Sequence, residues 1–240
     1  MIYIRSLLYF VGQALSAVVV FLAALVCYPF TSRKTLDRVI RLWAEFNIWS
    51  LDKICGTTHR VTGLESLPET PSIIISNHQS AWETLAFQVI FPAQSYLLKR
   101  ELLWIPIFGW GLAMSRPIAI NRSQKSRALD TLIKEGTARL DEGRWLIIFP
   151  EGSRMPPDKP ASFQAGGAMV AMRAGGTVVP VAHNAGVFWP KRGFLKLPGV
   201  IDVCVGQPIE ATGMKTRELN TAVETWIKEK LQTLPGISSQ

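Results

Sequence analysis

Cysteine and histidine are scarce in this chain, which limits the kinds of site that it can build. The 240 residues include three cysteines and three histidines. Cys27, Cys55 and Cys204 are widely spaced and lie mostly in apolar stretches. We interpret them as small buried hydrophobic side chains and not as a disulfide framework or zinc ligands. His59 and His183 lie far apart without companion ligands, so we predict no metal site.

Long runs of positive charge and the signatures of nucleic-acid-binding folds are also missing. The 26 Lys and Arg against 18 Asp and Glu give a formal net charge of +8, but the basic residues are scattered. Helix-turn-helix, zinc-finger and RNA-binding signatures are absent, so we expect no nucleic-acid partner. The positive charge instead favours phosphates, anionic lipid surfaces or acidic carrier proteins as partners.

Two common catalytic motifs are absent as well. The chain has no G-x-S-x-G, which would mark a serine nucleophile, and the segment GWGLAM at 109–114 lacks the third glycine of a dinucleotide fingerprint. A catalytic base in this chain would therefore act on an oxygen nucleophile that the substrate supplies.

Charge is missing from a long stretch near the N-terminus. No Asp, Glu, Lys or Arg occurs from Ser6 to Ser32. A helix needs about 20 apolar residues to cross the hydrocarbon core of a bilayer, so this stretch is long enough to span one. A secretory signal is the competing interpretation, but the stretch exceeds the usual ~7–15 apolar residues and no small-x-small cleavage site follows it. We therefore predict membrane attachment.

Residues 36–56 have the pattern of an amphipathic helix. Apolar residues, including Trp43 and Trp49, recur every three or four positions with charged residues between them. Both tryptophans fit an interfacial belt, so the two segments can form a helical hairpin in one leaflet, or one span followed by a surface helix. The basic residues between positions 33 and 41 outnumber the single Arg5, which places everything after the first segment in the cytoplasm. We expect residues 1–57 to form this membrane-associated segment.

The remaining residues, 58–240, alternate in the manner of an α/β domain. Several continuous β-branched runs indicate strands that are covered on both faces. We predict a mostly parallel mixed sheet flanked by helices, with the hydrophobic helical hairpin at the membrane. The predicted strands are 71–77, 116–121, 144–150, 177–183 and 199–206, and the predicted helices follow His78 and cover 126–140, 166–174 and the segment from Arg217.

The motif NHQSAWE at 77–83 lies at a predicted strand-to-helix junction, where functional groups of open α/β sheets gather. On a continuous helix His78 and Glu83 would point to different faces, so the pair meets only across a turn. In that arrangement the carboxylate keeps one imidazole nitrogen protonated, and the other nitrogen can accept a proton from an alcohol. A lone histidine near a glutamate is more often structural, so the spacing alone is weak evidence.

The motif FPEGSR at 149–154 strengthens this hypothesis. Gly152 lets backbone amides approach an anion, and Arg154 can bind a phosphate through two parallel hydrogen bonds. Lys99 and Arg122 each lie next to an apolar strand-like segment and add positive charge. The combination predicts proton abstraction beside a bound phosphate.

Four segments resemble, in order and approximate spacing, the four blocks of the glycerolipid acyltransferase family. They are NHQSAWE, LLKRELLWIPIFGWGLAMSRPIAINR, FPEGSR and TVVPVAH, and the resemblance covers roughly residues 60–210. N-terminal membrane segments are also usual in this family. Four ordered blocks are far more specific than one.

The resemblance implies a transferase of phospholipid biosynthesis. It implies transfer of a fatty acyl group from acyl-CoA or acyl carrier protein to the sn-2 hydroxyl of 1-acyl-sn-glycerol-3-phosphate, which gives phosphatidic acid. It further implies membrane lipids as partners, no cofactor, and a place at the bacterial inner membrane with the catalytic domain on the cytoplasmic face. By this resemblance, His78 is the general base and Glu83 orients it. Phosphate binding falls to Lys99, Arg122 and Arg154, and the substrate site is shaped by Glu151, Gly152 and Ser153.

Two positions depart from the family pattern. Glu83 stands where the family usually has aspartate, and Ser153 stands where it has threonine. The longer glutamate leaves the acceptor open, since a lyso-ornithine lipid or another lysolipid could replace lysophosphatidate. A hydrolase or transacylase, and a lipid-binding membrane protein without catalysis, are the further alternatives. The presence of both His78 and Arg154 argues against the last.

Overall fold

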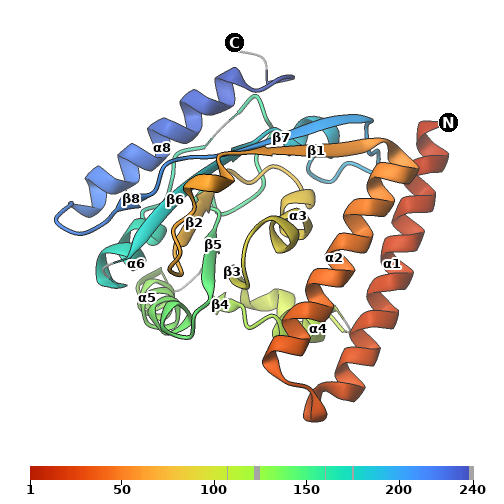
Figure 1. The fold of residues 1–240 in the computed structure, drawn as a ribbon, viewed down its shortest axis with the longest axis horizontal. Helices are drawn as coiled ribbons and strands as arrows, with labels where there is room; N and C mark the ends of the chain where they lie inside the picture. The colour runs from red at the N-terminus through yellow and green to blue at the C-terminus, as the bar shows by residue number, and fades with distance from the viewer. Residues whose placement is uncertain (107, 122–124, 160, 175, 238–240) are drawn as a thin grey trace.

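A mixed β-sheet runs through the centre of the molecule and separates two layers of helices (Figure 1). The computed structural model describes all residues except 107, 122–124, 160, 175 and 238–240. In this part of the chain the strand order is β1-β7-β6-β2-β5-β3-β4, and β8 pairs with β6. The strands are β1 Thr57–Thr62, β2 Ile73–Ser76, β3 Gln94–Lys99, β4 Ile118–Ile120, β5 Trp145–Ile148, β6 Thr177–His183, β7 Gly199–Val205 and β8 Ile209–Glu210.

The predicted fold class is confirmed, because most neighbouring strands are parallel. Among the described strands, only β7 and β8 run antiparallel to β6, while β1 runs parallel to β7. Each of the five predicted strands contains an observed one, but β1, β3 and β8 were not predicted.

Helices cover both faces of the sheet because side chains alternate along each strand. Ile74 and Ile147 point into a core beneath α1, α2 and α3, with Leu51 and Trp82. The neighbouring residues on the same strands point into a second core beneath α5, α6 and α8. The helices are α1 Ile2–Cys27, α2 Arg33–Cys55, α3 Trp82–Ile90, α4 Phe108–Met114, α5 Lys125–Asp141, α6 Gly166–Ala174, α7 Ala185–Phe188 and α8 Thr216–Thr233, with short 3-10 helices η1 Tyr28–Phe30, η2 Leu64–Ser66 and η3 Arg100–Trp104.

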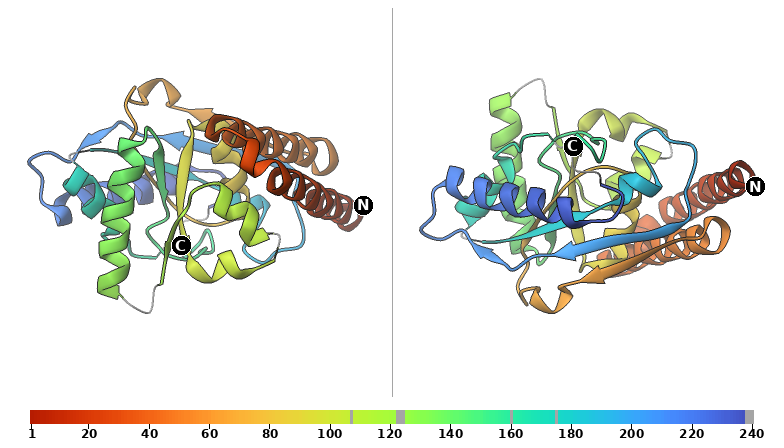
Figure 2. Two further views of the ribbon diagram at one scale, coloured as in Figure 1. Left: turned by 90° about the horizontal axis from the view of Figure 1, so that it is seen from below. Right: turned by 90° about the horizontal axis from the view of Figure 1, so that it is seen from above.

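The first two helices form a hairpin along one side of the molecule (Figures 1 and 2). Among the described residues, the stretch Ile2–Phe30 is long and apolar enough to cross a membrane, and most of its large apolar side chains are exposed. The two helices also contribute Tyr9, Ile48 and Leu51 to the core beneath the sheet. The predicted division between residues 57 and 58 falls after the first residue of β1.

The two tryptophans of α2 differ in their surroundings. Trp43 faces α1, where its Nε1 donates to Ser16 Oγ at 3.1 Å and its ring lies 5.3 Å from the ring of Phe21. Trp49 is exposed. Much of the apolar face of α2 is thus covered by protein, because the helix lies between α1 on one side and α3 and β1 on the other.

A buried arginine fastens α2 to the sheet. The Arg144 side chain is 7% exposed, and its guanidinium binds Asp37 Oδ2 at 2.6 Å, the Gln94 carbonyl oxygen at 2.6 Å and Ser95 Oγ at 3.1 Å. A charge buried this deeply is tolerated because every side of the guanidinium has an acceptor. The contact fixes α2 against the start of β3.

Candidate active site

The site residues gather at the carboxyl ends of parallel strands. β2 lies between β6 and β5, and β3 is the next strand beyond β5. All four run parallel, so the segments that follow Ser76, Ile148, Lys99 and His183 leave the sheet at the same edge. Ligands of open α/β sheets commonly bind at this edge.

His78 and Glu83 meet across a turn, as their spacing predicts. His78 Nδ1 lies 2.7 Å from Glu83 Oε1. The chain turns after β2, α3 begins at Trp82, and Glu83 therefore lies in the first helical turn. The same Oε1 atom accepts hydrogen bonds from the amide N–H groups of Gln79 at 2.9 Å and Ser80 at 2.8 Å. A carboxylate in this position lies in the first turn of the helix, where negative charge is favourable, and it holds both the turn before the helix and the imidazole.

The surroundings keep Glu83 ionised although its side chain is fully buried. Burial alone would raise the pKa of Glu83, but the electrostatic influence of the neighbouring His183 and His78 imidazoles and the hydrogen bonds from His78 and the Ser80 amide outweigh it, and the pKa lies below its ordinary value. An ionised Glu83 fixes a proton on Nδ1 of His78. The Nε2 atom is then the nitrogen that can accept a proton, and the His78 side chain is 16% exposed.

The loop after β5 holds His78 from the opposite side. The Phe149 ring is stacked on the imidazole, with centroids 4.2 Å apart and planes 13° from parallel. The His78 amide donates to Glu151 Oε2 at 2.9 Å, and the Met155 amide donates to the His78 carbonyl oxygen at 2.7 Å. Gly152 has a φ of 72°, a left-handed conformation that favours glycine, and this turn lets the loop fold back toward β2.

Burial raises the pKa of Glu151 to about 8, although hydrogen bonds from the His78 amide and from its own backbone lower it in part. The side chain is therefore mostly protonated and neutral near pH 7. A neutral carboxyl group at the His78 amide removes a negative charge that would repel an anionic substrate.

We expect Glu151→Gln to stabilise the protein relative to the parent as the pH rises. Because the folded-state pKa of about 8 lies above the ordinary value of 4.5, the folded parent binds more protons than the unfolded chain between these values. The parent thus loses stability as the pH rises through this window, and the loss levels off above the folded pKa. Melting temperatures of both proteins across the window should diverge with rising pH. A constant difference would contradict a raised pKa.

The predicted cations occupy different positions at this edge. Lys99 is the last residue of β3 and is exposed, and Arg154 is half-buried in the loop after β5. Adjacent strands lie about 4.8 Å apart, so β3, two strands from β2, ends about 10 Å from it. Ser153 is exposed and its hydroxyl lies 3.7 Å from Met155 Sδ. Arg122 lies outside the described residues.

Sequence reasoning missed the pair that locks β2 to β6. The Asn77 side chain accepts from the His183 amide at 3.0 Å and donates to the His183 carbonyl oxygen at 2.9 Å. The His183 ring donates from Nε2 to the Asn77 carbonyl oxygen at 2.9 Å and accepts from the Ala185 amide at Nδ1. Burial lowers the pKa of His183 and keeps it neutral. Asn77, which precedes His78, is thereby held at three of its atoms. This role becomes visible once β2 and β6 are known to be neighbours in the sheet.

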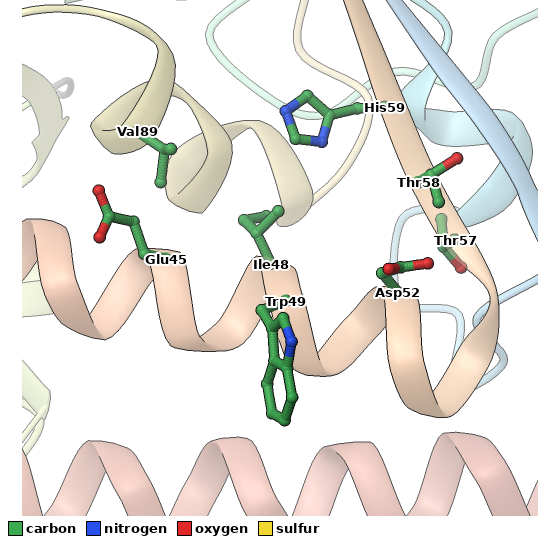
Figure 3. A pocket seen from close by; sticks show the side chains of 8 residues that line it. All are labelled: Glu45, Ile48, Trp49, Asp52, Thr57, Thr58, His59 and Val89. Atoms are coloured by element: carbon green, nitrogen blue, oxygen red, sulfur yellow. The ribbon is translucent and has the colours of Figure 1, made fainter.

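No cluster of three or more histidine, cysteine, aspartate or glutamate side chains suited to a metal ion occurs in the part of the chain that the structure describes. A hollow of about 320 Å³ lies between α2, α3 and β1 (Figure 3). Its walls carry the Glu45 and Asp52 carboxylates together with Trp49 and His59. None of the predicted site residues lines it.

A family model described as Acyltransferase matches residues 58–184, more than half of the chain. This chain belongs to the acyltransferase family. It is 41% identical, over 99% of its length and 94% of the relative's, to the 1-acyl-sn-glycerol-3-phosphate acyltransferase of Pseudomonas aeruginosa. It is 26% identical to the enzyme of the same name from Saccharomyces cerevisiae, over 98% of this chain and 78% of that one.

Its fold is likewise that of a solved acyltransferase. The crystal structure of the 1-acyl-sn-glycerophosphate acyltransferase from Thermotoga maritima is similar over 100% of both chains, with a TM-score of 0.81 and 26% identity. The resemblance therefore extends beyond the matched family segment and includes the hairpin of α1 and α2.

Proposed function

We propose that this protein transfers a fatty acyl group from a thioester to the sn-2 hydroxyl of 1-acyl-sn-glycerol-3-phosphate and so forms phosphatidic acid. The contact of His78 Nδ1 with Glu83 Oε1 at 2.7 Å carries the proposal, because it leaves Nε2 as the base in a chain that belongs to an acyltransferase family. The names of the relatives in Pseudomonas and yeast support the choice of acceptor.

His78 first accepts the proton of the acceptor hydroxyl at Nε2, and the hydroxyl oxygen attacks the thioester carbonyl carbon. The resulting tetrahedral oxyanion collapses, the carbon–sulfur bond breaks, and the imidazolium returns its proton to the leaving thiolate. Glu83 stays ionised throughout and stabilises the imidazolium. Neither a metal ion nor a covalent enzyme intermediate takes part.

The acceptor phosphate binds to the cations at the same edge of the sheet. Arg154 lies in the loop that holds His78, and Lys99 ends β3, the strand next to β5. Arg122 belongs to the same proposed set. Gly152 and Ser153 leave room and a hydroxyl group beside Arg154, and the Glu151 carboxyl group accepts a hydrogen bond from the His78 amide.

Arg154→Ala is expected to raise KM for lysophosphatidate about 10–100-fold, since a charge-assisted hydrogen bond contributes about 1.5–3 kcal/mol. Turnover at saturation should change much less. Steady-state kinetics on lysophosphatidate and on a monoacylglycerol without phosphate check this, with the exposed Arg173 of α6 replaced by alanine as the matched control. Equal losses on both acceptors would remove Arg154 from phosphate binding.

We further propose that the protein works at the inner membrane of a bacterium with its α/β domain on the cytoplasmic face. The apolar α1 and the basic residues at the start of α2 support this orientation. Acceptor and product both carry acyl chains that stay in the bilayer. A site held at the headgroup plane reacts with the acceptor without extracting it.

A labelled-donor assay with the purified full-length protein in vesicles tests the function. Acyl-CoA and acyl carrier protein loaded with the same labelled chain are compared as donors. Phosphatidate that forms only with lysophosphatidate and donor supports the proposal. Release of free fatty acid would indicate a hydrolase. Acylation of a lyso-ornithine lipid in place of lysophosphatidate would show that the acceptor is a different lysolipid. The absence of any product with either donor would favour a lipid-binding protein without catalysis.

A further inference from the structure

A second group of large apolar side chains is exposed on the segment between β3 and β4. It comprises Leu102, Trp104, Ile105 and Trp110, which are 36%, 69%, 44% and 48% exposed, and we call it the η3–α4 surface. Leaving such side chains in water costs about 25 cal/mol per Å² of apolar area. Contiguous exposed apolar surface of this kind commonly marks a contact with a partner or a membrane.

The η3–α4 surface is continuous with the exposed apolar side of α1. α4 packs against α1. Gly111 of α4 lies so close to Phe21 of α1 that an added Cβ would come within 2.6 Å of the ring. Leu22, Leu25 and Val26 follow on α1 and are exposed as well. α4 and the C-terminal part of α1 lie beside each other in both Figure 1 and Figure 2.

The composition and charge of this surface suit a lipid bilayer. Tryptophans such as Trp104 and Trp110 are enriched where a protein meets the headgroup region. Lys99 and Arg100 are exposed at the start of the segment, next to the exposed Glu101, and give it a net positive charge. Basic side chains beside inserted apolar ones are attracted to anionic lipids, each by about 1 kcal/mol.

We propose that the η3–α4 surface is a second membrane contact, which inserts into the headgroup region of the leaflet that holds α1. The proposal rests on the membrane attachment proposed above and adds a contact on the catalytic side of the sheet. Because η3 directly follows Lys99 at the end of β3, the contact places the site edge against the membrane. An acceptor lipid then moves from the leaflet to His78 without passing through water.

Tryptophan emission in vesicles tests this contact. The parent and the double variant Trp104→Phe/Trp110→Phe are reconstituted as full-length proteins in phosphatidylethanolamine and phosphatidylglycerol vesicles, with and without acyl chains brominated near the headgroup. Subtracting the two spectra isolates the emission of the two replaced tryptophans. Bromine should quench most of this difference emission. The phenylalanines keep the surface apolar, and circular dichroism verifies the fold.

A difference emission that bromine leaves unchanged would overturn the proposal. The same result is expected if the η3–α4 surface binds a second copy of this chain and not the membrane. The six remaining tryptophans, which include Trp49 on α2, report separately on attachment through the hairpin. Their quenching without quenching of the difference emission would leave the hairpin as the sole contact. The measurement needs no turnover, so it stands apart from a failure of the proposed reaction.

Kinetics provide a second readout. Leu102→Ser/Trp104→Ser/Ile105→Ser should raise KM several-fold for a long-chain acceptor in vesicles and leave KM unchanged for a short-chain acceptor dissolved as monomers. Val200→Ser is the matched control, since Val200 is 44% exposed but lies on β7, four strands away from β3 in the sheet. Equal KM values for the triple variant and the control on vesicles would contradict the proposal.

Discussion

His78→Ala should lower turnover about 10²–10⁴-fold, the loss expected when a positioned general base is removed. The acceptor hydroxyl would have to lose its proton to water, while the phosphate-binding cations and the thioester site remain. KM for the acceptor should therefore change little. Single-turnover measurements with a labelled donor separate the chemical step from binding and product release.

The matched control for this variant is His59→Ala. His59 is the other partly exposed histidine, and its ring packs edge-on against Trp82 at 5.6 Å. It has no role in the proposed reaction, so its loss should affect stability more than turnover. Unchanged turnover in the His78 variant, with an unchanged melting temperature, would remove His78 from the mechanism.

Glu83→Gln is expected to lower turnover by roughly 10²–10⁴-fold while the protein still folds. If the amide nitrogen takes the position of Oε1, it donates toward Nδ1, and the proton of the imidazole is then forced onto Nε2. In either orientation no negative charge stabilises the imidazolium that forms during the reaction. The acceptor KM should stay near the parent value, because Glu83 is buried and does not reach the substrate.

Glu83→Asp is the informative companion to this variant. It keeps the charge but shortens the side chain, and it should retain more activity than the glutamine variant if charge matters more than reach. Among the described residues, Glu83 Oε2 is buried without a hydrogen-bond partner, so an amide placed there costs stability of about 1–3 kcal/mol. Thermal melts separate that cost from the loss of rate. A glutamine variant as active as the parent would make Glu83 a bystander.

The fold was predictable wherever one segment carried its own apolar pattern. The run Ile73–Ser76 and the run Trp145–Ile148 are fully buried strands, and their continuous apolar sequences indicate this directly. β1 escaped prediction because Thr57–Thr62 mixes threonines with His59 and Arg60 at the sheet edge. β3 begins with Gln94 and Ser95, polar residues whose burial depends on Arg144.

The candidate site was predictable only in its local part. The meeting of His78 and Glu83 needs a single turn, which the strand-to-helix junction provides. The hydrogen bond from the His78 amide to Glu151 joins residues that are 73 positions apart in the sequence. The hydrogen bonds between Asn77 and His183 join residues that are 106 positions apart. Such contacts depend on the order of strands in the sheet, which no local pattern encodes. The catalytic and phosphate-binding roles themselves stay predictions until the variants are measured.

The loop after β5 contacts His78 through both its amide and its carbonyl oxygen, and this has a consequence for synthesis on the ribosome. A growing chain that has emerged only as far as β4 already contains the imidazole and its carboxylate, but not the strand and loop against which they are set. The backbone contacts that hold His78 therefore form only after the chain has emerged at least as far as Met155.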